Sequence, residues 1–269
     1  MKQLLERSVE VGREEGVQSL LNKSSTYVHQ KGTRCYYRVM PHVIEKQTLE
    51  TKRSSAEFYV DSWKEYECTN TPSSEEVLID RIITNSKETD VVYDVGAGIG
   101  THSCLIKPFV SQVVAFEPHP KNAEKCRTNA ELNNEDVQVM DVALSDSSGV
   151  AELKLHVDVV GDAGHTLAFD SNGTDVETVE VPVKTGDELI TASEIPPPNI
   201  LKIDAEGQGL EVLKGLENAI ASDACRQIYF EIHPQENRDD VEKYLSDNGF
   251  ETNIIDKREG AEFMRAWVP

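Results

Sequence analysis

Residues 91–100 read V-V-Y-D-V-G-A-G-I-G, and the run V-V-A-F-E follows at 113–117. The first run predicts a buried strand that ends in Asp94, and a helix is expected to start at about Ile99. Three glycines form the turn between them, namely Gly96, Gly98 and Gly100. Glycines let a ligand approach the backbone closely, and the start of a helix offers unpaired N–H groups. The second run predicts a strand that ends in Glu117, whose carboxylate can bind both hydroxyls of a ribose, so the two runs favour a nucleoside cofactor.

The spacing of the glycines distinguishes two nucleoside cofactors. A dinucleotide fingerprint reads G-x-G-x-x-G and places a pyrophosphate on the helix N-terminus. Here the glycines are spaced G-x-G-x-G, and Thr101 stands where the third glycine of that fingerprint belongs. Asp94 would repel a pyrophosphate but attract a cation, and S-adenosylmethionine carries an ammonium, a sulfonium and a ribose without a phosphate. The pattern therefore favours S-adenosylmethionine over NAD.

The charge of the chain is the second unusual feature. Its 269 residues carry a formal net charge of −21, with a pI near 4.7, and the acidic residues are scattered. Self-repulsion at this charge would destabilise the fold in dilute buffer, whereas 1 M salt shortens the Debye length to about 3 Å. We therefore expect a halophilic protein that works in high salt. The same charge argues against a large nucleic-acid footprint, so no DNA partner is expected and RNA is disfavoured.

The sequence shows no sign of a membrane span or of a secretion signal. No apolar stretch is long enough to cross a bilayer, and the first ten residues lack an apolar core. The five cysteines form an odd set without a C-x-x-C pair, which is typical of reduced thiols rather than of a disulfide framework or a zinc site. The expectation is a soluble, cytoplasmic protein whose oligomeric state the sequence leaves open.

Strands that alternate with helices from residue 91 onward predict an α/β fold. The expected strands cover 91–95, 112–117, 137–140, 150–157, 176–183, 199–204, 228–232, 250–256 and 263–268. The expected helices cover 2–22, 99–110, 119–133, 207–221 and 238–248. A capping box made by Ser73 and Glu76 is expected to start one more helix. This order implies the plan of a class I methyltransferase, a Rossmann-like, mostly parallel sheet of seven strands with a C-terminal antiparallel hairpin.

The chain divides into two parts. Residues 1–65 are polar with scattered aromatics and are expected to form an N-terminal extension of mixed helix and irregular structure, followed by the methyltransferase domain at 66–269. The extension and the glycine-rich loop at 158–175 are expected to shape the acceptor pocket. The side chains of interest there are Tyr36, Tyr37 and His165.

A second group of acids is expected near the first. Ligands of open α/β sheets bind at the carboxyl ends of the strands, which bear four acids here: Asp94, Glu117, Asp204 and Glu231. Asp204 lies in L-K-I-D-A-E-G with Glu206 just beyond it. Glu231 and His233 lie in F-E-I-H-P, two residues apart, and share a face if the strand continues that far.

These residues offer two ways to activate an acceptor. Methyl transfer is an in-line displacement at the sulfonium methyl, and an alcohol acceptor must also lose a proton. Asp204 or His233 can serve as the base. Alternatively, Asp204 and Glu231 can hold a divalent metal that lowers the pKa of the acceptor hydroxyl, although two carboxylates do not define a metal site. Lys202 can instead pair with one of these acids.

Five segments of the chain resemble the FkbM family of S-adenosylmethionine-dependent methyltransferases. They are V-Y-D-V-G-A-G-I-G-T-H, F-E-P-H-P-K-N, V-A-L-S-D-S-S-G, L-K-I-D-A-E-G-Q-G-L-E-V-L-K-G and F-E-I-H-P. The resemblance covers about residues 66–250, and K-I-D-A-E-G is its most specific part. It implies O-methylation of a sugar, or of a hydroxyl on a glycoconjugate or natural product.

The resemblance also implies which residues contact the cofactor. They are Asp94, Gly96, Ala97, Gly98, Gly100, Thr101, Glu117, Pro118 and, beside the adenine, Asp141, Val142 and Ala143. A tyrosine–glutamate pair often precedes the first strand of this family, and Tyr66 and Glu67 match it. The family commonly has an acidic residue where this chain has Gly209, which shifts the expected catalytic role to Asp204 and Glu206, beside Glu231 and His233.

Three functions stay open at this point. The leading one is an O-methyltransferase for a hydroxyl of a saccharide or another small acceptor. RNA 2′-O-methylation would place Lys202, Asp204 and Glu231 around a ribose, although the acidic surface disfavours it. The third is a non-catalytic S-adenosylmethionine-binding or scaffold protein. A dehydrogenase is disfavoured by the spacing of the glycines.

Overall fold

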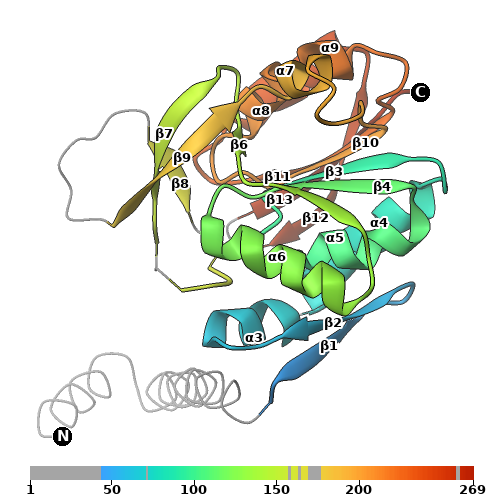
Figure 1. Ribbon diagram of the computed structural model, residues 1–269. Helices are drawn as coiled ribbons and strands as arrows, with labels where there is room; N and C mark the ends of the chain where they lie inside the picture. The colour runs from blue at the N-terminus through green and yellow to red at the C-terminus, as the bar shows by residue number, and fades with distance from the viewer. Residues whose placement is uncertain (1–43, 71, 157–158, 163–164, 169–176, 259–260) are drawn as a thin grey trace, which may run out of the picture.

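Seven strands form the central sheet, in the order β12-β13-β11-β10-β3-β4-β5 (Figure 1). Their bounds are β3 Val91–Val95, β4 Gln112–Phe116, β5 Val137–Met140, β10 Ile200–Ile203, β11 Gln227–Ile232, β12 Glu251–Arg258 and β13 Ala261–Trp267. The five strands from β11 to β5 are parallel, whereas β13 is antiparallel to both of its neighbours. The computed structural model describes residues 44–70, 72–156, 159–162, 165–168, 177–258 and 261–269. The predicted α/β class, the parallel sheet and the closing hairpin are confirmed.

Helices cover both faces of this sheet (Figure 1). One face carries α4 Pro72–Asn85, α5 Thr101–Ile106 with the short 3₁₀ helix η2 Lys107–Phe109, and α6 Pro120–Leu132. The other face carries α7 Gly186–Thr191, α8 Gly209–Lys214, α9 Glu217–Ile220 and α10 Arg238–Asp247. Neighbouring residues of β3 belong to different cores, since Val92 packs among residues of α4 and α5 while Tyr93 packs among residues of α8 and α9. Burial on both faces explains why these strands are apolar runs in the sequence.

An N-terminal hairpin packs under the first of these faces. It consists of β1 Lys46–Glu50 and β2 Ser55–Tyr59 and is followed by helix α3 Trp63–Asn70. Leu49 and Phe58 are buried with Ile79 and Ile82 of α4. Residues 46–59 are therefore a hairpin and not irregular structure. The expected helix at 2–22 and the residues Tyr36 and Tyr37 lie outside the described residues.

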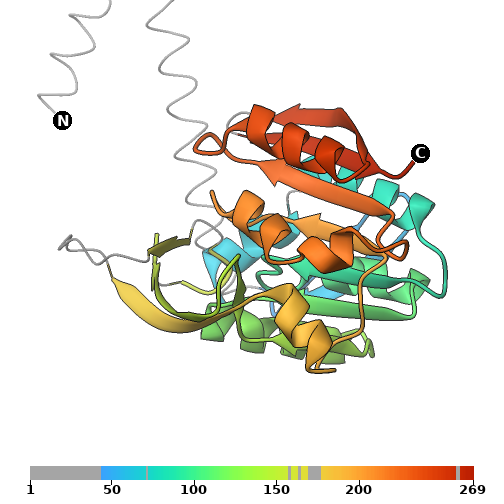
Figure 2. The same ribbon diagram turned by 90° about the horizontal axis from the view of Figure 1, so that it is seen from above.

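A second, four-stranded sheet is inserted between β5 and β10, in the order β6-β9-β7-β8 (Figures 1 and 2). Its strands are β6 Ala143–Leu144, β7 Gly149–Lys154, β8 Thr166–Ala168 and β9 Thr178–Lys184. β7 is antiparallel to β8 and to β9, and β6 is parallel to β9. The strands predicted at 150–157 and 176–183 are β7 and β9, so they belong to this sheet and not to the central one.

Two local predictions are wrong. The helix predicted over 207–221 is interrupted between α8 and α9, where the carbonyl of Gly215 accepts a hydrogen bond from the backbone N–H of Asp187 at 3.0 Å. Helix α4 begins at Pro72, so Ser73 lies inside the helix and is not its N-cap. Proline is common at the first helical position because it has no N–H to leave unpaired.

Two further features concern the described helices and cysteines. None of the helices in the described ranges has the length and apolar character needed to cross a membrane. Four of the five cysteines belong to the described residues and form no disulfide there, namely Cys68, Cys104, Cys126 and Cys225.

Candidate cofactor and acceptor site

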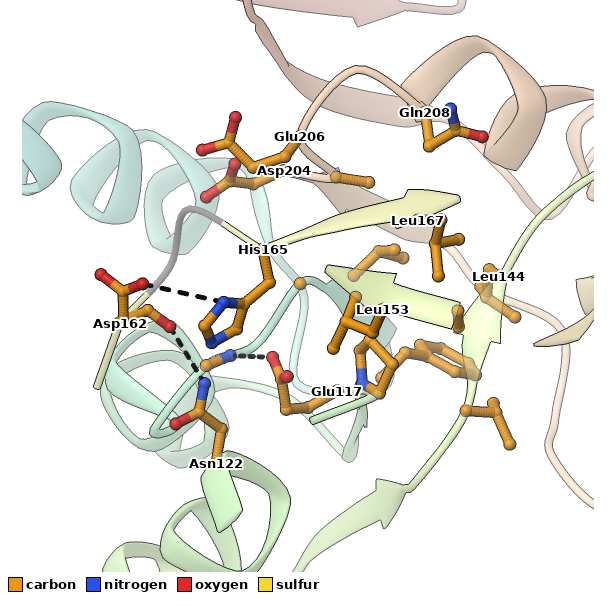
Figure 3. Close-up of a pocket in the computed structure, with 18 residues that line it drawn as sticks. Glu117, Asn122, Leu144, Leu153, Asp162, His165, Leu167, Asp204, Glu206 and Gln208 are labelled. Atoms are coloured by element: carbon orange, nitrogen blue, oxygen red, sulfur yellow. Dashed lines mark hydrogen bonds and ion pairs between the residues drawn. The ribbon is translucent and has the colours of Figure 1, made fainter. Parts of the chain in front are cut away.

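A cavity opens at the carboxyl ends of β3, β4 and β10 (Figure 3). Loops after these strands line one side with Gly96, Gly98, Glu117, Pro118, Asp204 and Glu206. The second sheet and its adjoining segments line the other side with Val142, Ala143, Leu144, Leu153, Asp162, His165 and Leu167. The cavity therefore lies between the two sheets, at the edge where ligands of α/β sheets bind.

The glycine turn is in direct contact with the loop that carries Asp204. Gly96 has a φ of +73°, and a Cβ atom at this position would lie 1.9 Å from the carbonyl oxygen of Asp204. The backbone N–H of Asp204 in turn donates to the carbonyl of Val95 at 3.1 Å. A side chain at residue 96 would push the two loops apart, so glycine is needed for this close approach.

Glu117 stands at the end of β4, as predicted, and faces the cavity. Its carboxylate accepts hydrogen bonds from the backbone N–H groups of Gly98 and His119, both at 2.8 Å. Burial raises the pKa of this carboxyl to about 7, although both hydrogen bonds favour the charged form. Glu117 thus holds the glycine turn in place and presents a carboxylate whose charge changes near neutral pH.

Asp94 lies beneath the glycine turn and does not line the cavity. Its fully buried carboxylate lies 3.0 Å from Nζ of Lys202 and accepts a hydrogen bond from the Ser103 hydroxyl at 2.7 Å. Burial acts to raise the pKa of this carboxyl, but Lys202, His102 and Ser103 outweigh it, so the pKa is lowered. The carboxylate of Asp94 therefore pairs with Lys202 in this structure, and a contact between Asp94 and the cofactor stays a prediction.

The two ends of the cavity differ in character, as Figure 3 shows. One end is apolar and contains Leu144, Leu153 and Leu167. The other end is acidic and contains Asp162, Asp204 and Glu206, and Glu117 lies between the two ends. This order suits a ligand with an apolar base, a ribose and a cationic group. The residues present therefore fit S-adenosylmethionine.

His233 lies against carboxylates at the acidic end. Its Nε2 is 2.9 Å from Oδ1 of Asp204, and its Nδ1 is 3.4 Å from Oε2 of Glu206. Single ligand atoms of Asp204, Glu231 and His233 all lie within 4.8 Å of one another. The structure thus brings together the four residues that the sequence assigned to catalysis. Asp204 and Glu206 line the cavity, whereas Glu231 and His233 do not.

The charges of this group shift the pKa values of its members. Burial lowers the pKa of His233, but the hydrogen bond to Asp204 and the charges of Asp204, Glu206 and Glu231 outweigh it and raise the pKa to about 9. Burial also raises the pKa of Glu206 above its ordinary value. The neighbouring carboxylates therefore favour the protonated form of His233.

Gly209 stands where the family commonly has an acidic residue, and it lies close to Phe230 and Glu236. A Cβ atom at Gly209 would lie 2.2 Å from the Phe230 ring and 2.8 Å from Oε1 of Glu236. Glu236 instead accepts hydrogen bonds from the backbone N–H groups of Gly209 at 2.9 Å and His233 at 2.8 Å. Glu236 was not anticipated, and it fixes the loop that carries His233.

Three segments meet at the wall around Asp162, whose side chain is almost fully buried. Its carboxylate lies 3.3 Å from Nζ of Lys64 on α3 and 3.3 Å from Nδ1 of His156. Asn122 of α6 holds the same loop, donating to the Asp162 carbonyl at 3.1 Å and accepting from the Gly161 N–H at 3.0 Å. The wall thus depends on contacts between residues that are far apart in the sequence.

Several residues expected to contact the cofactor do not line the cavity. Glu67 pairs with Lys64 at 3.2 Å, and Asp141 bonds to Arg127 at 3.3 Å. The remaining ones are Ala97, Gly100 and Thr101, which lie in or after the glycine turn. The lining residues that the sequence did not suggest are Phe116, Asn122, Leu144, Leu153, Asp162, Leu167, Ala205 and Gln208. Only the G-D-A-G-H loop and His165 gave a signal for this wall.

A comparison with protein families identifies the chain. The model of the "Methyltransferase FkbM domain" matches residues 94–252. The chain belongs to the FkbM methyltransferase family. Membership makes it an enzyme that transfers methyl groups, and this family implies S-adenosylmethionine as the methyl donor.

Two curated relatives are similar to this FkbM protein. The "Hexuronic acid methyltransferase AglP" of Haloferax volcanii is 31% identical over 215 residues, which cover 80% of this chain and 86% of the relative. The "Methyltransferase sdnD" of Sordaria araneosa is 27% identical over 218 residues, which cover 70% of this chain and 80% of the relative.

Solved structures with a similar fold include other methyltransferases. The FkbM methyltransferase of Methylobacillus flagellatus has a TM-score of 0.47 and 14% identity, covering 76% of this chain and 54% of that one. The precorrin-6y C5,15-methyltransferase of Geobacter metallireducens has a TM-score of 0.47 and 13% identity, covering 73% and 90%.

Proposed function

We propose that this protein transfers a methyl group from S-adenosylmethionine to an oxygen of a saccharide that contains a hexuronic acid. The observation that carries the proposal is the cavity with one apolar end, one acidic end and Glu117 between them. The 31% identity to a hexuronic acid methyltransferase supports the acceptor class. We further propose that the acceptor oxygen belongs to a hydroxyl group of the saccharide and not to its carboxylate.

The cofactor would be held by residues from both sheets. Leu144, Leu153 and Leu167 would receive the adenine, and Glu117 would accept hydrogen bonds from the ribose hydroxyls. The carboxylates of Asp204 and Glu206 would face the positively charged end. When bound, the cofactor supplies an electrophilic methyl group on a sulfonium.

Removal of the acceptor proton would fall to the pair of Asp204 and His233. Their 2.9 Å contact holds the imidazole in one orientation, as a base requires. Because the pKa of His233 is about 9 in this structure, the imidazole must first lose its proton. A cation bound at the acidic end lowers this pKa by repulsion, so binding of the cofactor would itself favour the neutral base.

The same group of side chains also meets the simplest requirement for a divalent cation. Asp204, Glu231 and His233 each offer one ligand atom within 4.8 Å of the others. A metal there would lower the pKa of the acceptor hydroxyl. Activity before and after treatment with EDTA, followed by addition of Mg²⁺ or Mn²⁺, decides whether the protein alone carries out the deprotonation.

The test combines binding and turnover. Calorimetry with S-adenosylhomocysteine should show binding, and S-adenosylmethionine labelled in its methyl group should transfer label to a glucuronide or galacturonide but not to RNA. An alkali-stable product is a methyl ether on a hydroxyl, whereas an alkali-labile product is a methyl ester on the carboxylate and would overturn the hydroxyl assignment. Binding without turnover on any acceptor would favour a scaffold. Affinity for NADH alone would overturn the cofactor.

We also propose that the protein acts in the cytoplasm at high salt. The charge of −21 and the absence of disulfides among the described cysteines support this environment. Residues 1–65 remain the expected N-terminal extension and 66–269 the expected methyltransferase domain.

A further inference from the structure

We propose that Lys202 is a positioning residue that couples the cofactor-binding turn to the Asp204–His233 pair. The inference rests on the proposed function and deepens it, because it assigns a role to the lysine of the K-I-D-A-E-G segment. Lys202 lies on β10 at the centre of the sheet and is only 1% exposed. A buried lysine is costly unless several partners compensate its charge.

The ammonium of Lys202 has partners on both sides. Toward the cofactor turn, it donates to the carbonyl of Gly96 at 3.1 Å and lies 3.0 Å from the carboxylate of Asp94. Toward the acceptor side, it lies 3.7 Å from Oδ2 of Asp204, whose Oδ1 contacts His233. One ammonium thus connects the residue that forms the turn with the residue that orients the imidazole.

Lys202 interacts with more carboxylates than the single partner of an isolated ion pair. Charged groups that face the Asp204–His233 pair include Lys202, Glu206, Glu231 and Glu236, and Asp94 lies against Lys202. Lys202 is a cation among these carboxylates. Without it, Asp204 would lose its 3.7 Å contact with the ammonium, and the Gly96 carbonyl would lose a donor.

This coupling matters because methyl transfer requires alignment of the cofactor with the acceptor oxygen. Small displacements of a positioned group reduce rates strongly in such reactions. Gly96 and Asp204 are already in backbone contact, and Lys202 adds a charged link between the same two loops. A hydrophobic pair in place of Asp94 and Lys202 could preserve packing but would not provide this link.

The experiment compares the wild type with Lys202→Met, Asp94→Asn and the double variant Asp94→Asn/Lys202→Met. Lys202→Met leaves a buried carboxylate unpaired and should destabilise the protein, whereas the double variant removes both charges and should recover a melting temperature near that of the wild type. In the double variant, kcat should remain at least about tenfold lower while KM for the acceptor changes less. The dissociation constant for S-adenosylhomocysteine, measured by calorimetry, should also rise in the double variant, because the carbonyl of Gly96 loses its donor.

Recovery of both kcat and the affinity for S-adenosylhomocysteine in the double variant would show that Lys202 only neutralises Asp94, and the inference would fail. Lys184→Met is the matched control, because Lys184 is a half-exposed lysine that pairs with Glu188 away from the cavity. If the double variant does not fold, Lys202→Arg is the second variant to measure. It keeps the charge and should keep most of kcat, and a loss of kcat as large as that expected for the double variant would contradict the proposal. If the wild type methylates no uronide, the proposed function fails, while the affinity for S-adenosylhomocysteine still tests the link between Lys202 and the turn.

Discussion

The central sheet and the second sheet of this protein contribute to one cavity but are encoded very differently. The strands β3, β4 and β10 are almost continuous apolar runs, since helices cover both of their faces. The strands β7 and β9 alternate between buried and exposed residues, since only one face is covered. The comparison shows that the wall formed by the central sheet was recognisable in the sequence, whereas the wall formed by the second sheet was recognised only in part, through Val142, Ala143 and His165.

The largest expected effect concerns the polar wall. Asp204→Asn should lower kcat by about 10²–10⁴-fold, the range for loss of a general base or of the residue that orients it, with less change in cofactor affinity. Single-turnover kinetics with labelled cofactor, together with calorimetry, would measure the two effects separately. Asp247→Asn, an exposed partner of Lys243 on α10, is the control. Unchanged turnover would make Asp204 a structural residue.

The next prediction compares the two walls with the same substitution. Leu201→Ala in β10 and Leu153→Ala in β7 both remove a buried leucine, and each should lower the free energy of unfolding by about 2–5 kcal/mol. Only Leu153 lines the cavity, so only Leu153→Ala should also weaken binding of S-adenosylhomocysteine. Denaturant unfolding and calorimetry measure the two quantities. If Leu201→Ala and Leu153→Ala weakened binding equally, Leu153 would not contact the cofactor directly.

A smaller effect is expected at the residue between the two walls. Glu117→Ala should weaken cofactor binding by about 1.5–3 kcal/mol, the range for a hydrogen bond to a charged group. Because the pKa of Glu117 is about 7, affinity in the wild type should also fall as the pH drops below 7. Glu117→Gln should lose this pH dependence, and Glu180→Gln, an exposed residue of β9, should retain it. A dissociation constant that is unchanged in Glu117→Ala would refute the ribose assignment.

The smallest effect per residue is the effect of salt on stability, because each surface charge contributes little and the sum over the whole surface is what is measured. The net charge of −21 predicts a melting temperature that rises from dilute buffer to molar KCl, by about 2–4 °C for each kcal/mol gained. A sorbitol series at matched osmolarity separates charge screening from solute exclusion. Equal melting temperatures at low and molar KCl would contradict the expectation of a halophilic protein.

Asp94 illustrates where prediction from sequence reached its limit. Its place at the end of an apolar strand before the glycines was read correctly, and so was the possibility that Lys202 pairs with an acid. The sequence did not say which acid Lys202 pairs with, because Lys202 comes from β10, which is far from β3 in the sequence but adjacent in the sheet. Pairings between strands decide which acid is neutralised and which faces the cavity.

The sequence by itself determined the α/β class, the strand ends that carry Glu117, Asp204 and His233, and the family, because local patterns of apolar residues, glycines and acids are sufficient for these. Only the tertiary structure decided that Asp162 and Leu153 line the cavity and that Asp94 forms an ion pair with Lys202. Such contacts join segments that no local pattern relates, and their geometry follows from how the two sheets pack.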